Sequence, residues 1–231
     1  MLRLQILSGA PEIREKAIGM LVELLRKGIG REVLSEMLDS GLPELEEEAL
    51  HQICNLPQEA RPPVLEKCLD NKSKSFRLEA LQLMRDLNGP DVNSLFVKAI
   101  QDPEPEVLTA VTDLFSSCSD QPLQKAAAAG LKSPNEGIRT AALGYLHDTR
   151  AWLSLEVLIQ QGLNSSYPDV VHGSADALRV LTQADVNSDN YSDWAKWYKE
   201  NGRKWAVDND PTFGTVAAST LPALPPGYGK K

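Results

Sequence analysis

The stretch from residue 69 to residue 84 reads LDNKSKSFRLEALQLM, and its pattern returns twice at a spacing of 31 residues. The second copy, at 100–115, reads IQDPEPEVLTAVTDLF, and the third, at 131–146, reads LKSPNEGIRTAALGYL. Each copy begins with an apolar residue, passes through a polar turn, and then carries apolar or small residues four positions apart. Residues at i, i+4 and i+8 share one face of an α-helix, so each copy predicts a turn followed by a helix.

The same register extends over most of the chain. Its first apolar position is occupied by Ile13, Leu45, Phe76, Val107, Ile138 and Val171. Four positions later come Ala17, Ala49, Ala80, Val111, Ala142 and Ala175. A second register, which marks the partner helix of each pair, runs through Leu38, Leu69, Ile100, Leu131 and Leu163. Two registers with one period predict a helix–turn–helix unit repeated five to six times.

Proline and glycine occur where this arrangement requires them. Prolines that precede or open the first helix of a unit are Pro11, Pro43, Pro105 and Pro168. The first turn of a helix tolerates proline because its missing N–H has no partner there. No alternating β-branched run of useful length occurs before residue 206. The predicted fold class is therefore an all-α solenoid.

Three units share a more specific motif: Ile13-Arg14-x-x-Ala17, Phe76-Arg77-x-x-Ala80 and Ile138-Arg139-x-x-Ala142. Each follows a polar or proline-containing turn, and over residues 10–182 the pattern resembles that of HEAT repeats. The resemblance implies a HEAT-like α-solenoid in which a turn aspartate and a helix arginine form a ladder between neighbouring repeats. Asp70 and Arg77 fit that ladder most directly. Other units carry Glu46, Leu108 and His172 at the arginine position, so a continuous ladder is not expected.

The composition changes after the repeats, which predicts three regions: a solenoid at 1–184, an aromatic capping helix at 185–207, and an extended tail at 208–231. Trp194, Trp197 and Tyr198 share a helical face at i, i+3 and i+4, and Gly202 is expected to end that helix. This W-x-x-W-Y pattern is similar to the terminal helices of bacterial HEAT-repeat proteins. Two interpretations remain open: a cap over the last repeat, or an anchor for a partner.

The tail contains four prolines and no helical stripe. Its apolar residues are Phe213, Val216, Leu221, Leu224 and Tyr228. A segment of this composition is disordered in an isolated monomer, lies along a partner surface, or folds back on its own solenoid. We expect Phe213, Leu221, Leu224 and Tyr228 to contact a partner.

Charge and hydropathy exclude several classes of protein. The formal net charge is −8, with 24 basic and 32 acidic side chains, and nucleic-acid binding needs a basic surface instead. No apolar run approaches the roughly 18 residues that span a bilayer. The first residues are too weakly apolar for a secretory signal, so a cytoplasmic protein is expected, and a processed chain from another compartment would look the same.

Motifs of known catalytic sites are missing from the sequence, so neither an enzyme nor a cofactor nor a metal site is predicted. The histidines at 51, 147 and 172 lie in different repeats. Cys54 and Cys68 are expected in the core, and Cys118 is expected to be exposed.

Two further features bear on binding. The second helices of the fourth and fifth units carry little charge, which predicts an apolar docking surface around Gln124, Ala128, Trp152 and Leu155. The cluster of Glu44 and Glu46–Glu48 falls in the first turn of a helix, where the helix dipole favours it. Docking of a basic partner segment is the alternative interpretation of this cluster.

The function predicted from these features is a non-catalytic protein–protein interaction scaffold, an assembly or structural subunit of a larger enzyme complex. It docks through the solenoid face and the tail, with no nucleic acid, membrane insertion or small-molecule substrate. Two alternatives remain: a HEAT-type lyase that binds a tetrapyrrole, which family analogy suggests, and a transient regulatory adaptor.

Overall fold

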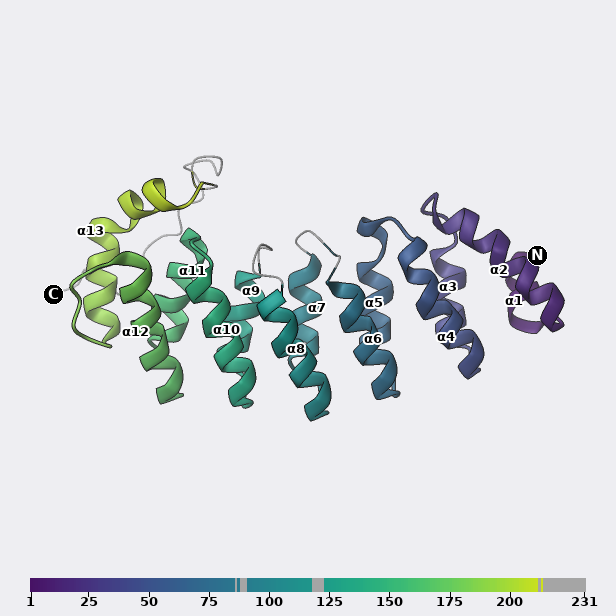
Figure 1. Cartoon of the computed structure of the whole chain (residues 1–231), viewed down its shortest axis with the longest axis horizontal. Helices are drawn as coiled ribbons and strands as arrows, with labels where there is room; N and C mark the ends of the chain where they lie inside the picture. Colours follow the sequence, from purple (N-terminus) through teal and green to yellow (C-terminus); the bar gives the residue numbers. More distant parts are fainter. Residues whose placement is uncertain (86, 88–90, 118–122, 212, 214–231) are drawn as a thin grey trace, which may run out of the picture. The chain divides into compact units, whose positions relative to one another are not determined.

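The computed structural model describes residues 1–85, 87, 91–117, 123–211 and 213 (Figure 1). Within these residues every regular element is a helix, and no strand occurs, which confirms the predicted all-α repeat fold. The chain divides into two compact units, the first from Met1 to Tyr145 and the second from Leu146 onward. The predicted region boundaries at 184 and 207 remain predictions.

The helices of the first unit follow the predicted pairs, with one additional helix at the start. In chain order they are α1 (Leu2–Ser8), α2 (Pro11–Leu25), α3 (Arg31–Leu38), α4 (Pro43–Gln52), α5 (Pro62–Leu69), α6 (Lys74–Met84), α7 (Asp91–Ala99), α8 (Pro105–Ser117), α9 (Gln124–Gly130) and α10 (Glu136–Asp148), of which the residues from Leu146 belong to the second unit. Two short 3-10 turns, η1 (Ile53–Asn55) and η2 (Gln58–Ala60), connect α4 to α5.

The pairs stack in two layers (Figure 1). One layer contains α3, α5, α7 and α9, each in contact with the next, and the other contains α4, α6 and α8. This is the arrangement of a helical-repeat stack, in which each pair contacts mainly its neighbours. Glycines at 28 and 30 adopt positive φ values of 74° and 93°, which reverse the chain between α2 and α3.

The two predicted registers form the core of the first unit. Leu21, Ile53, Met84 and Phe115 are at most 1% exposed, and the partner register at 38, 69, 100 and 131 is at most 7% exposed. The small residue in each stripe permits close helix contact. A Cβ added at Gly130 would lie 2.9 Å from that of Ala142, so α9 and α10 meet there with no room to spare.

Ile13 is the most exposed residue of its register, in which Phe76 and Val171 are half-buried. Its side chain is 47% exposed, whereas Leu45, Val107 and Ile138 are at most 1% exposed. Ile13 lies on α2, which packs against α1, a helix of only seven residues. The expected inward stripe is therefore incomplete in the first pair.

Arg77 joins two consecutive repeats, although with a different aspartate than expected. Its Nε donates to Oδ2 of Asp102 at 2.6 Å, and Nη2 donates to Oδ1 at 3.0 Å. Its Nη1 donates to the carbonyls of Asn71 and Lys72 in the preceding turn. The predicted partner was wrong: Asp70, at the exposed end of α5, accepts from Lys98 at 2.6 Å instead.

Lysines form a second set of contacts between repeats. Lys98 of α7 pairs with Asp70, which lies 28 residues earlier in the chain. Lys67 of α5 pairs in the same way with Asp39, which is also 28 residues earlier than its lysine. These pairs are solvent-accessible, so each contributes little to stability.

The second unit is built from α11 (Trp152–Val157), a π-helical segment η3 (Leu158–Gly162), α12 (Pro168–Thr182) and α13 (Tyr191–Asn209). The α13 helix does not end at Gly202, as the sequence suggested, but continues through it to Asn209. Gly202 is buried, and a Cβ there would lie 2.9 Å from Cδ2 of Tyr198. Gly202 therefore makes room for the Tyr198 ring of the same helix and does not end the helix.

Polar contacts hold the connector between α12 and α13. Arg179 donates to the carbonyl of Val186 at 3.1 Å and to Asp189 at 2.5 Å. His172 lies 2.9 Å from the same carboxylate, which raises the pKa of the histidine. The indole N–H of Trp194 donates to the Ser188 carbonyl, so the connector is fixed from both of its helices.

Replacing Arg77 by alanine should destabilise the first unit strongly. The side chains of Arg77 and Asp102 are 10% and 6% exposed, and the change leaves a buried carboxylate without its cation. We expect the free energy of unfolding, measured by urea titration, to fall by about 3 to 5 kcal/mol. The matched control is Lys74→Ala, which removes the exposed pair with Glu106 and should cost less than about 1 kcal/mol. Equal losses would contradict the importance of burial.

Two glycine-to-alanine changes should have opposite effects. Gly144→Ala places a methyl group in open space on α10 and should stabilise the protein by about 0.5 to 1 kcal/mol, the usual gain in helix propensity. Gly202→Ala crowds the Tyr198 ring and should destabilise it by about 1 to 2 kcal/mol. Thermal unfolding measures both, and a stabilised Gly202→Ala variant would show that the ring moves freely.

Candidate protein-docking surfaces

The residues expected to form an apolar docking patch are mostly buried. Gln124 and Ala128 are each 7% exposed, and Leu155 is fully buried. The alanine run of α9 packs inside the chain, where Asn93 accepts from the Ala126 N–H at 3.0 Å. The Tyr145 hydroxyl accepts from the Leu123 N–H at 2.7 Å. Low charge on this helix thus reflects burial, contrary to the expectation of an exposed patch.

Trp152, by contrast, lies in an aromatic cluster of the second unit. Its ring stacks on Tyr198 with centroids 4.7 Å apart and an interplanar angle of 30°, and it also contacts Phe213 at 5.3 Å. The backbone N–H of Trp152, at the start of α11, donates to Oδ2 of Asp210 at 2.8 Å. The structure therefore brings together three predicted residues that are up to 61 positions apart in sequence.

The other tryptophans of α13 face the same unit. Trp194 is fully buried and meets the partly exposed Trp197 edge to face, with centroids 6.0 Å apart. The indole N–H of the buried Trp205 donates to the Leu181 carbonyl at 3.0 Å. These are contacts within the unit, as the cap interpretation requires. The predicted partner contacts Leu221, Leu224 and Tyr228 lie outside the described residues.

A half-buried hydrogen bond links Tyr198 of the aromatic cluster to Glu156. The Tyr198 hydroxyl donates to Oε1 of Glu156 at 2.6 Å. Burial raises the pKa of Glu156, and the hydrogen bond from Tyr198 partly opposes that rise. Burial and the adjacent carboxylate raise the pKa of Tyr198 far above its usual value, so the phenol remains the donor at neutral pH.

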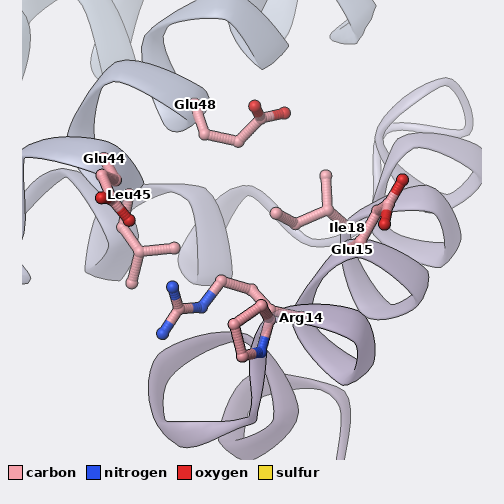
Figure 2. Close-up of a pocket in the computed structure, with 7 residues that line it drawn as sticks. Arg14, Glu15, Ile18, Glu44, Leu45 and Glu48 are labelled. Carbon is pink, nitrogen blue, oxygen red and sulfur yellow. The ribbon is translucent and has the colours of Figure 1, made fainter.

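In the first unit, a groove separates α2 from α4 (Figure 2). It has a volume of about 300 Å³. The residues that line it are Pro11, Arg14, Glu15, Ile18, Glu44, Leu45 and Glu48. Figure 2 shows Ile18 and Glu48 facing each other from the two helices, while Arg14 extends from α2 toward α4. The groove is therefore apolar in part and bordered by three carboxylates and one guanidinium.

The charged groups of the groove are incompletely paired. Arg14 donates from Nε to the Ile6 carbonyl at 3.1 Å, and Glu48 accepts from Gln52 at 2.6 Å. Among the described residues, Glu15 and Glu44 form neither an ion pair nor a side-chain hydrogen bond. The sequence singled out Glu44 and Glu48, but it did not indicate that Arg14, Glu15 and Ile18 would line the same groove.

Exposed apolar side chains are frequent on α1 and α2 and just before α1, α3 and α4. They are Met1, Leu4, Ile13, Met20, Ile29 and Leu42, with exposures from 46% to 97%. Ile13 and Met20 are seven positions apart on α2 and thus share a face. A gathering of exposed apolar groups is a common property of interaction surfaces.

The cysteines occupy different environments. Cys68 is buried, as expected, and burial raises its pKa to about 12, so it is a neutral thiol at physiological pH. Cys54 was expected in the core but is exposed. The α4 helix ends at Gln52, and the tighter η1 turn buries Ile53 while Cys54 donates to the His51 carbonyl. Cys118 lies outside the described residues.

Within the described part of the chain, no group of three or more His, Cys, Asp or Glu side chains is arranged to hold a metal ion. Over the same residues, every helix is too short or too polar to cross a bilayer.

No family model matches this chain, and no curated protein matches it. Among solved structures it is similar to an engineered protein, with 20% identity, a TM-score of 0.43, and coverage of 79% of this chain and 95% of that chain. It is also similar to a designed armadillo repeat protein in complex with the peptide (KR)4, with 16% identity, a TM-score of 0.44, and coverage of 78% of this chain and 98% of that chain. A second engineered protein gives 18% identity, a TM-score of 0.40, and coverage of 90% and 70%.

Burial of Glu156 should make stability depend on pH, and the hydrogen bond from Tyr198 should reduce that dependence. Because the pKa of Glu156 is raised above 4.5 in the folded state, the free energy of unfolding should fall as pH rises through that raised pKa. Tyr198→Phe keeps the ring but removes the group that lowers this pKa. We expect it to cost about 1 to 2 kcal/mol at pH 7 and clearly less at pH 4.

Urea titration at both pH values measures this difference. Glu156→Gln is the control, since it removes the titrating group and should flatten the pH dependence. A Tyr198→Phe loss of the same size at pH 4 and pH 7 would show that Glu156 does not respond to the phenol.

Proposed function

We propose that this protein is a non-catalytic protein–protein interaction scaffold, a structural or assembly subunit of a larger complex. The observation that carries the proposal is the surface of α1–α4, which has a partly apolar groove on one face of α2 and exposed apolar side chains, Ile13 and Met20, on another face of the same helix. A stack of helix pairs supports an extended surface of this kind without needing a deep polar pocket.

The location of the exposed apolar groups supports a docking role for α1–α4. Ile13 and Met20 lie on α2, whose residues also line the groove. Burial of both side chains against a partner would remove apolar surface from water, which favours association. The aromatic rings around Trp152 contact one another within the second unit, so we assign this cluster a role in stabilising the fold.

Charging α2 should release a partner from the native complex. We expect the tagged protein, purified from its own cells, to carry a protein partner in fixed stoichiometry. Ile13→Glu combined with Met20→Glu should reduce that partner at least tenfold, because two carboxylates would have to be buried at the interface. Quantitative mass spectrometry of the purified complex gives the ratio.

The matched control is Val180→Glu with Val207→Glu, which charges two exposed apolar positions of the second unit. It should leave the ratio unchanged. Full recovery of the partner by the folded α2 variant would refute this docking surface. A partner in variable, substoichiometric amounts would indicate a transient adaptor instead of a subunit.

A further inference from the structure

We infer that the groove between α2 and α4 binds a basic, amphipathic segment of a partner protein. The inference rests on the proposed function and specifies the chemistry of the occupant. It depends on three properties of the groove: its size, its apolar lining, and the sign of its charges.

The size of the groove suits a segment and not a folded domain. The lining residues of α2, at 11, 14, 15 and 18, lie on one helical face and span about two turns, or roughly 10 Å. A volume of about 300 Å³ corresponds to about ten water molecules of liquid. The groove therefore admits a few side chains that project from one helix or extended strand of the partner.

Apolar groups give the groove a hydrophobic part. Leu45 is almost completely buried below it, Ile18 is half-buried on the α2 side, and Pro11 lines it at the start of α2. An apolar side chain of the partner would displace water from Ile18 and Pro11. The chemistry of these groups requires at least one Leu-, Ile- or Met-like residue in the segment.

The charges select a basic partner. The groove is lined by the glutamates Glu15, Glu44 and Glu48 and by a single cation, Arg14, whose Nε already donates to the Ile6 carbonyl. Within the described chain Glu15 and Glu44 have no cation of their own. Lysine or arginine side chains that flank the apolar residue would meet these carboxylates, whereas an acidic segment or a phosphate backbone would be repelled.

A second copy of this chain is a poorer occupant. The net charge of −8 on each copy opposes self-association. Glu12, in the first turn of α2, and Glu47 of α4 are exposed and add negative charge to the two helices that form the groove. A basic segment gains from the same charges that repel a second copy.

Binding of a designed peptide to the full chain tests the inference. The probe is a fluorescein-labelled 15-residue peptide with leucine at every third or fourth position and lysine between, and an analogue with glutamate in place of lysine is the comparison. Fluorescence anisotropy at moderate salt gives the dissociation constant. We expect Glu15→Gln, Glu44→Gln and Glu48→Gln together to weaken binding of the basic peptide about tenfold or more.

A matched variant separates a specific groove from general attraction to an acidic protein. Glu59→Gln, Glu136→Gln and Glu200→Gln remove the same total charge from exposed positions elsewhere and should weaken binding less than threefold. Ile18→Ala should also weaken binding, with little change in its salt dependence. Thermal unfolding verifies that each variant is folded, since loss of Glu44 from the α4 terminus costs only tenths of a kcal/mol.

Several results would overturn the inference. Equal losses of affinity in the two triple variants would show that the peptide binds through the net charge of the protein and not through the groove. Equal affinity for the acidic analogue would show that the groove does not select a basic segment. Light scattering that shows a dimer, dissociated by the groove variant, would assign the groove to a second copy. If the groove variant keeps its native partner while the Ile13/Met20 variant loses it, the basic-segment inference fails and the proposed function stands.

Discussion

The structure of the first unit depends on one steric constraint: neighbouring helices must approach closely enough to bury a narrow apolar stripe. A small residue at the centre of each stripe, such as Ala80 or Ala142, makes that approach possible. The contact between Gly130 and Ala142 shows how little room remains. Larger side chains at these positions would separate the helices and expose the flanking register residues. The 31-residue period therefore reflects the packing of neighbouring repeats.

Polar groups then fix the turns between the closely packed helices. Arg77 and Arg139 occupy equivalent positions, and each donates to two carbonyls in the turn just before its own helix. In Arg77 the remaining nitrogens reach Asp102 of the following turn. One guanidinium therefore connects three consecutive segments. The buried cation is tolerated because nearly all of its donors are used.

Sequence periodicity predicted the helices and the core because burial repeats with the helical period. It failed where the outcome depends on distances between helices. Arg77 has aspartates in the turns on both sides, and spacing alone does not reveal which of Asp70 and Asp102 lies over it. Likewise, the uncharged character of Gln124 and Leu155 is typical of an exposed docking surface and of a fully buried helix alike. The groove depends on how far α2 stands from α4, for which no sequence pattern exists.

The unpaired carboxylates of the groove cost little in the free protein. Glu44 lies in the first turn of α4, where the exposed N–H groups and the helix dipole favour negative charge, and Glu15 is exposed to water on α2. Solvation and the helix dipole thus offset the repulsion between these carboxylates without an ion pair to either of them. Because no internal ion pair has to be broken, an incoming cation gains its full interaction with these groups. Glu44, which stabilises the start of α4, is therefore also one of the carboxylates that would bind the basic segment we propose.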